Sequence, residues 1–145
     1  MIALIQRVTE ASVSANGETV GRIGPGLLAL IGILPDDGER SVLRMLDRLL
    51  GFRVFADPEG RMNLCLQDIE GGLLLVPQFT LTADTKKGMR PSLSSAAPPG
   101  LAQCLFEQLV AEARRAWPIV SSGIFGAEMR VSLVNHGPVT FWIEA

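Results

Sequence analysis

The chain has 145 residues, of which 48% are hydrophobic and 19% charged, and its formal net charge at pH 7 is −2. So many apolar side chains exclude an intrinsically disordered protein, and the length fits a single domain that spans residues 1–145. The slight negative charge excludes a protein that coats nucleic acid over a broad surface, because that mode requires many Lys and Arg side chains against phosphates.

The first residues predict a strand rather than a targeting signal. Gln6, Arg7 and Glu10 interrupt the apolar run in MIALIQRVTE, and no cleavage-site pattern follows. No stretch approaches the roughly 18 apolar residues that span a membrane, so we expect a cytoplasmic protein with no membrane partner. Cys65 and Cys104 lie far apart, and the chain has one histidine. We therefore expect two reduced thiols, no metal site and no cofactor.

A hairpin and a buried strand are predicted next. IALIQRV and ASVSA are typical of β-strand segments, and Asn16-Gly17 is the pair that a type I′ turn prefers, because both central residues need a positive φ. TVGRI is the predicted returning strand. After the turn Gly24-Pro25-Gly26, the continuous apolar run LLALIGI predicts a strand that is buried on both faces.

Residues 41–50 predict an amphipathic helix, because their apolar side chains recur at helical spacing with charged residues between them. The following FRVFADPEGRMNL predicts a strand, a turn and a second strand. Another apolar strand is predicted over GGLLLVPQFTL, residues 71–81. Pro77 stands near the end of this strand and cannot donate a hydrogen bond to a β ladder.

The segment 82–99 is polar and rich in Pro and Ser, which predicts a long exposed loop of the kind that is often functional. Pro98-Pro99 introduces a second predicted helix, which ends at Trp117-Pro118. The tail segments AEMRVSLVN and PVTFWIEA predict two final strands. The resulting order, β-β-β-α-β-β-α-β-β, indicates an α+β fold with two main helices and a mostly antiparallel or mixed sheet.

Residue types alone allow several kinds of site to be weighed. An esterase that pairs Thr80 or Cys65 with His136 is one alternative, but no G-x-S-x-G motif occurs. Cys65 lies between two leucines, which predict a core strand and an inert thiol. Neither common glycine-rich phosphate motif occurs, which argues against nucleotide-driven chemistry. Two basic clusters can meet one or two phosphates: Lys86, Lys87 and Arg90 form one, and Arg114 and Arg115 form the other. Such clusters are more often solvated surface.

Four long stretches resemble the D-aminoacyl-tRNA deacylase family, and together they cover essentially the whole chain. They are RVTEASVSANGETVGRIGPGLL, RVFADPEGRMNLCLQD, PQFTLTADTKKGMRPS and FGAEMRVSLVNHGPVTFWIE. The family signature Asn-x-Gly-Pro-x-Thr is met in full by Asn135, Gly137, Pro138 and Thr140. The signature Ser-Gln-Phe-Thr-Leu is met by Gln78, Phe79, Thr80 and Leu81, with Pro77 in place of the serine.

This resemblance implies a barrel-like homodimer that hydrolyses D-aminoacyl-tRNA, and glycine mischarged on alanine tRNA, without a cofactor. Gly137-Pro138 is then a cis peptide that one subunit inserts into the active site of the other, where it collides with L side chains, and Arg7 braces it. Gln78, Phe79 and Thr80 are the expected catalytic segment, in which backbone groups position the ester and the 2′-hydroxyl of the tRNA assists. The substrate contact is the 3′ acceptor end of the tRNA, with Lys86, Lys87 and Arg90 as possible further contacts.

Two alternatives to a strict D-specific deacylase follow from the same residues. Pro77 matches a related branch that removes L-alanine from threonine tRNA, which implies a relaxed gate. A non-catalytic nucleic-acid-binding module on the same fold is the other alternative, because a fold alone does not fix a function.

Overall fold

The computed structural model describes residues 1–86 and 88–145, and the fold begins with a long hairpin. Strands β1 (Ile2–Ala15) and β2 (Glu18–Ile23) pair antiparallel. They are joined by Asn16 and Gly17, whose φ angles of 52° and 83° are the positive values that a type I′ turn requires. The predicted turn is therefore confirmed, although the two predicted segments before it form one continuous strand.

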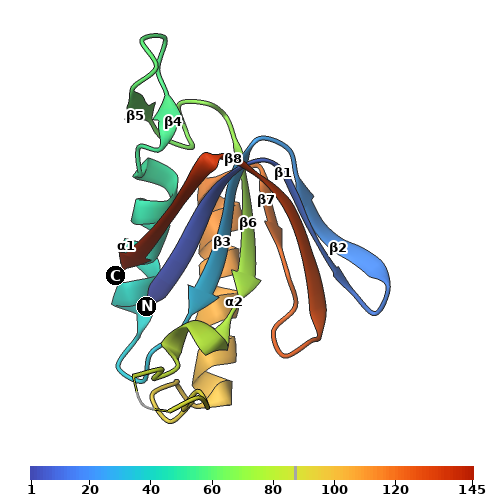
Figure 1. Cartoon of the computed structure of the whole chain (residues 1–145), viewed down its shortest axis with the longest axis vertical. Coiled ribbons are helices and arrows are strands. Elements are labelled where there is room, and N and C mark those ends of the chain that lie inside the picture. Colours follow the sequence, from blue (N-terminus) through green and yellow to red (C-terminus); the bar gives the residue numbers. More distant parts are fainter. Residues whose placement is uncertain (87) are drawn as a thin grey trace.

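Strand β1 is the centre of a curved mixed sheet (Figure 1). One edge of β1 pairs with β3 (Gly26–Gly32), and the other edge pairs along its length with β8 (Met129–Glu144). Parallel to β3 runs β6 (Gly72–Pro77), which pairs in parallel with β7 (Val120–Ser122). The Ser121 hydroxyl on β7 donates to the Arg22 carbonyl on β2, so the sheet curls into a nearly closed barrel. This architecture confirms the predicted α+β class and mixed sheet.

Helices α1 (Glu39–Gly51) and α2 (Pro99–Ala116) cover one face of the sheet (Figure 1). Their apolar sides, including Met45 and Leu109, bury the main core against β1, β3 and β6. A smaller core around Val13, Leu28 and Leu74 fills the inside of the curl on the opposite face. The short strands β4 (Phe55–Ala56) and β5 (Met62–Leu64) form a separate hairpin after α1.

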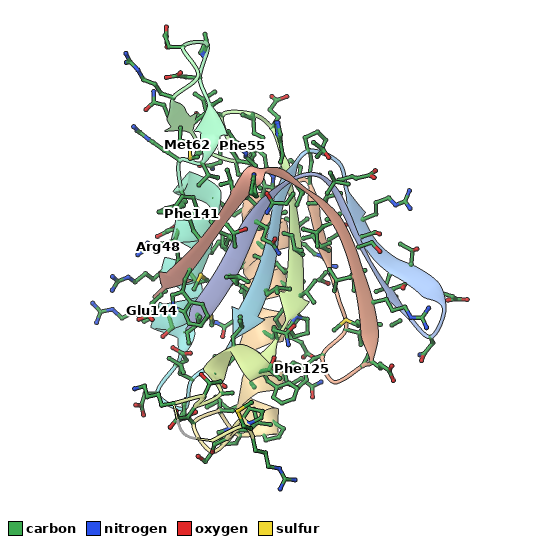
Figure 2. The ribbon with its side chains drawn as sticks, viewed as in Figure 1. Arg48, Phe55, Met62, Phe125, Phe141 and Glu144 are labelled. Carbon is green, nitrogen blue, oxygen red and sulfur yellow. The ribbon has the colours of Figure 1, made fainter. Side chains whose placement is uncertain are left out.

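The end of β8 packs against α1, which fixes this strand beside the helical layer. Phe141 makes an edge-to-face contact with Phe52, with ring centroids 5.5 Å apart, and an Arg48 guanidinium NH donates to the Glu144 carbonyl at 3.4 Å. Figure 2 shows Arg48, Phe141 and Glu144 along this seam. Among the described residues, no helix has the length and apolarity needed to cross a membrane.

The structure corrects three local predictions. The strand predicted over 71–81 ends at Pro77, and Phe79–Thr82 forms a 3-10 helix, η1, because proline cannot donate the next ladder hydrogen bond. The tail is a single strand with an insertion rather than two strands. Cys65 follows β5 instead of lying in a core strand, and its backbone NH donates to the Asp68 carboxylate. The three-residue strand β7 was not predicted, because so short a segment has no readable period.

Candidate functional site

Residues 135–140, called the gate segment below, form an insertion in β8 opposite Arg7. On β1, Gln6 and Val8 are two residues apart, whereas their partners on β8, Thr140 and Asn135, are five residues apart. Strand β8 therefore holds three extra residues here and must bulge out of the ladder. The Gly137–Pro138 peptide in the bulge is cis, as the resemblance implies, and both residues are exposed.

The Asn135 side chain closes this bulge by replacing missing ladder bonds. Its Oδ1 accepts the Val139 backbone NH at 2.7 Å, and its Nδ2 lies 3.2 Å from the Val139 carbonyl oxygen. The same amide nitrogen lies 3.0 Å from Thr140 Oγ1 and 3.1 Å from Gln6 Oε1. One amide thus bridges the base of the insertion, which explains the Asn and Thr at its two ends.

Arg7, on the neighbouring strand β1, anchors the gate segment. Its Nε donates to the His136 carbonyl at 2.8 Å, and its Nη1 donates to the Val54 carbonyl at 2.6 Å. Gly137 has a φ of 147°, and a Cβ placed there would lie 2.6 Å from Val139 Cγ2 and 3.2 Å from Arg7 Nη2. Because no larger residue fits between these neighbours, position 137 requires glycine.

A cleft of about 690 Å³ lies at the end of β6, where η1 begins. Gln78 and Phe79 line one side of it, and residues 125–127, between β7 and β8, line another. The Phe79 side chain is 56% exposed, so its ring stands at the cleft mouth rather than in the core. The remaining lining residues are largely apolar: Val76, Pro77, Leu93, Ala96, Ala97, Pro98, Pro99, Ala102, Met129 and Val131.

Hydrogen bonds fix η1 at the edge of this cleft. The Gln78 backbone NH donates to the Ile31 carbonyl at 2.7 Å, and the Gln78 side-chain amide donates to Thr80 Oγ1. The buried Thr82 hydroxyl donates to the Phe79 carbonyl at 2.7 Å. Phe79 and Thr80 open a 3-10 helix, so their backbone NH groups have no partner within it and remain available to other acceptors.

The gate segment and the cleft lie at opposite ends of the sheet within one chain. Arg7, below the gate segment, pairs with Leu27 at the start of β3, whereas Gln78 bonds to Ile31 near its end. Four residues of strand span about 13 Å. In Figure 1 the bend of β8 lies near β4 at the top, and η1 lies below the end of β6. The two predicted motifs are therefore not brought together in one chain.

This separation also keeps the Thr80 hydroxyl and the His136 imidazole apart within one chain. His136 belongs to the gate segment, and the Thr80 hydroxyl is bonded to Gln78 at the other end of the sheet. Within one chain, Thr80 therefore has no imidazole within reach to act as a base. Cys65, the other candidate nucleophile for a pair with His136, follows β5 and does not line the cleft.

The basic residues predicted to contact tRNA lie in the segment that follows η1. Lys86 and Arg90 are exposed there, and both lie between the bridged residues Asp84 and Ser92. Lys87 lies outside the described residues. Arg114 and Arg115 are exposed in the last turn of α2, and Arg115 forms an ion pair with Glu112. Within residues 1–86 and 88–145, no group of three or more His, Cys, Asp or Glu side chains is placed to hold a metal ion.

The sequence did not reveal the walls of the cleft or the support for Arg7. Leu93, Phe125 and Met129 come from three separate segments, and no local pattern distinguishes them from core residues. Val54 contributes only a backbone carbonyl, which any residue supplies. The exposure of Phe79 could not be predicted from the sequence, because a Phe next to a buried strand is normally predicted to lie in the core.

Comparison with known proteins gives consistent matches over the whole chain. A family model described as D-Tyr-tRNA(Tyr) deacylase matches residues 4–144. The chain is 65% identical over 145 residues to a D-aminoacyl-tRNA deacylase of Azotobacter vinelandii, with 100% of both chains covered. It is 57% identical to a protein of the same name from Pseudomonas aeruginosa PAO1, again with 100% of both covered.

Two solved structures share the fold. One is titled c-Myc DNA Unwinding Element Binding Protein, with a TM-score of 0.94, 34% identity, and coverage of 100% of this chain and 99% of that one. The other is titled as a probable eukaryotic D-amino acid tRNA deacylase, with a TM-score of 0.87 and 19% identity over 99% of this chain and 98% of that one. The second likeness bears on the fold alone.

Proposed function

The chain belongs to the D-Tyr-tRNA(Tyr) deacylase family, and we propose that it acts as a homodimer in which the gate segment of each subunit closes the cleft of the other. It hydrolyses the ester bond of D-aminoacyl-tRNA, which makes it a hydrolase of translation quality control. The homodimer, the site residues and the mechanism given below are the proposed part.

The observation that supports the shared site is the separation of the two motifs. The exposed, firmly held gate segment contributes no residue to the cleft at η1 in its own chain. In a two-fold dimer, one isologous contact can place the gate segment of each subunit at the cleft of its partner, so that every cleft is closed by a gate segment. The exposed Trp142 on β8, 47% accessible, is one apolar side chain that such a contact would cover.

In this arrangement the backbone of Gly137 and Pro138 rejects L substrates by collision. A pocket that bound each D side chain would need different contacts for every amino acid, whereas a clash on the L face excludes all L residues regardless of their chemistry. A glycyl ester has no side chain to collide, so it also enters. Arg7 and Asn135 keep the colliding atoms in place through their bonds to the His136 carbonyl and to Val139.

The reaction itself needs little from protein side chains. Water attacks the ester carbonyl carbon, the bond to the tRNA 3′ oxygen breaks, and that oxygen leaves with a proton, giving free amino acid and tRNA. Backbone groups of Phe79 and Thr80 position the ester and stabilise the developing oxyanion, and the 2′-hydroxyl of the terminal ribose assists. Gln78 orients the Thr80 hydroxyl through its hydrogen bond.

The proposed partner in the cleft is the 3′ acceptor end of aminoacyl-tRNA. This is a small footprint, which suits a protein with a net charge of −2. Lys86, Lys87 and Arg90 are the proposed phosphate contacts, and Lys86 and Arg90 are exposed in the segment that follows η1. We also propose that residues 1–145 act as one domain, that no metal or organic cofactor takes part, and that the enzyme works in the cytoplasm.

Deacylation of D-Tyr-tRNA and L-Tyr-tRNA in the presence of a chelator tests the proposed function. We expect release of D-tyrosine, no release of L-tyrosine, and no effect of the chelator. Absence of D-tyrosine release, or its loss on chelation, would contradict the proposal. Light scattering at the assay concentration tests the dimer, and a monomeric mass with full chiral activity would contradict the shared site.

Two other functions are each favoured by one observation. Pro77 replaces the family's serine beside the catalytic segment, which favours a relaxed enzyme that also releases L-alanine from threonine tRNA. The structural neighbour titled as a DNA unwinding element binding protein favours nucleic-acid binding without catalysis. The latter predicts salt-sensitive duplex binding that survives mutation of Gly137 and Pro138, and a flat salt response would exclude it.

A further inference from the structure

Residues 123–128, called the wall segment below, join β7 to β8 and form one side of the cleft. Phe125, Gly126 and Ala127 line the cleft directly, as Phe79 does. Figure 2 shows Phe125 between η1 and the start of β8. The Phe125 ring leans on Phe106 of α2, with centroids 6.5 Å apart. The width of the cleft therefore depends on what holds the backbone of this segment.

The wall segment lacks one backbone anchor because of Pro77. The parallel ladder between β6 and β7 includes Leu73 donating to Ile119 and Gly123 donating to Leu75, each at 2.8 Å. The next bond in this alternation would run from the NH of residue 77 to the Gly123 carbonyl. Proline has no NH, so the ladder ends at the Gly123 NH, and the Gly123 carbonyl receives no bond from residue 77.

The Met129 thioether occupies the place beside this missing bond. Its Sδ accepts the Ile124 backbone NH at 3.3 Å. A Cβ placed on Gly123 would lie 2.7 Å from that sulfur and 3.4 Å from Pro77 Cδ, so the sulfur packs directly on the Gly123 backbone next to the proline ring. A thioether is a weak acceptor but a polarizable side chain that fills irregular space.

We propose that Met129 is a positioning residue for the deacylation: its sulfur holds the wall segment in place of the β6–β7 ladder bond that Pro77 cannot make, and so sets the Phe125 side of the substrate cleft. This inference rests on the proposed function, since it assigns the cleft to the aminoacyl end of the substrate. Met129 touches no reacting atom in this account, so its loss changes how substrate is held rather than the bond-breaking step.

Met129→Leu tests this directly, because leucine keeps the volume of the side chain and removes the acceptor. Met62→Leu is the matched control, since Met62 is 49% exposed on β5, away from the cleft. For Met129→Leu we expect KM for D-Tyr-tRNA to rise about five-fold with kcat within about two-fold, which is the signature of lost binding. Hydrogen exchange of the Ile124 amide should accelerate on the order of five-fold. Met62→Leu should change neither quantity.

A second variant, Gly123→Ala, tests the proposal independently in case Met129→Leu fails to fold. Gly123→Ala leaves the sulfur in the chain but puts a methyl group where it packs, so it should reproduce the rise in KM. Unchanged KM and unchanged Ile124 exchange in both variants would overturn the proposal, as would a fall in kcat at constant KM. Faster exchange without a change in KM would equally overturn the positioning role. If the wild type proves inactive on D-Tyr-tRNA, the proposed function fails, whereas the exchange measurement still decides whether the sulfur holds the wall segment.

Discussion

The gate segment and the cleft are built in opposite ways. In the gate segment, polar side chains bond the backbone: Asn135 bonds Val139 in both directions, and Arg7 bonds the carbonyls of His136 and Val54. The cleft is lined mostly by apolar side chains, and part of its wall rests on a thioether contact. A backbone that must reject substrates by collision has to be held rigidly, whereas a cleft that must admit many side chains does not. The comparison predicts that polar mutations at the gate alter selectivity and that mutations at the cleft alter rate or binding.

Arg7→Ala should have the largest effect on selectivity. It removes two charge-assisted hydrogen bonds, each worth about 1.5–3 kcal/mol, so the ratio of D-Tyr-tRNA to L-Tyr-tRNA hydrolysis should fall about 100-fold. Arg130→Ala is the control, because Arg130 is an exposed arginine of β8 outside the gate segment. Rates on both substrates measure the ratio. A ratio that stays within about two-fold of wild type in the Arg7 variant would break the comparison.

Asn135→Ala should lower the same ratio by about 30-fold, because the two bonds to Val139 are neutral and therefore weaker than those of Arg7. Asn135→Asp retains the acceptor for the Val139 NH but loses the donor to the Val139 carbonyl. Its ratio should lie between wild type and Asn135→Ala. Equal ratios for the alanine and aspartate variants would mean that the acceptor contributes nothing.

Side-chain changes in the catalytic segment should affect rate modestly and leave selectivity intact. Thr80→Val removes the hydroxyl that Gln78 bonds, and we expect kcat to fall less than about 10-fold with the D-to-L ratio unchanged.

His136→Ala should change kcat by less than about two-fold, since the His136 backbone carbonyl, not its imidazole, bonds Arg7. A loss of about three orders of magnitude or more in either variant would instead indicate nucleophilic catalysis by these side chains.

Pro77→Ser should have a small effect that is confined to one substrate. Serine supplies the NH that the β6–β7 ladder lacks next to Gly123, which ties down the wall segment without touching the gate. If Pro77 relaxes the site, this variant should hydrolyse L-Ala-tRNA about three-fold more slowly, with D-Tyr-tRNA hydrolysis unchanged. No change in either rate would make Pro77 a neutral residue at the end of a strand.

Much of the fold could be predicted from local patterns, and the failures have physical causes. The turn at Asn16-Gly17 and the two helices are fixed by backbone preference and by apolar periodicity, both of which are visible in the sequence. The end of β6 was placed too late, because the apolar pattern continues into Phe79 although the hydrogen bonding stops at Pro77. The residues proposed for the gate and for catalysis were found by resemblance to family motifs. Their position at opposite ends of the sheet depends on strand register, which no local pattern contains.

The central claim is that each active site combines the cleft of one chain with the gate segment of another. It is tested by mixing Arg7→Ala, which has an intact cleft and a defective gate, with Ala127→Trp, whose gate segment is intact and whose cleft is filled by the new ring, because Ala127 lines the cleft. With the second chain in roughly ten-fold excess, subunit exchange places almost every Arg7→Ala cleft under an intact gate.

We predict that hydrolysis of L-Tyr-tRNA per Arg7→Ala chain then falls toward zero while hydrolysis of D-Tyr-tRNA continues. L-Tyr-tRNA hydrolysis that stays constant after complete subunit exchange would contradict the account, because it would show that each chain gates its own cleft.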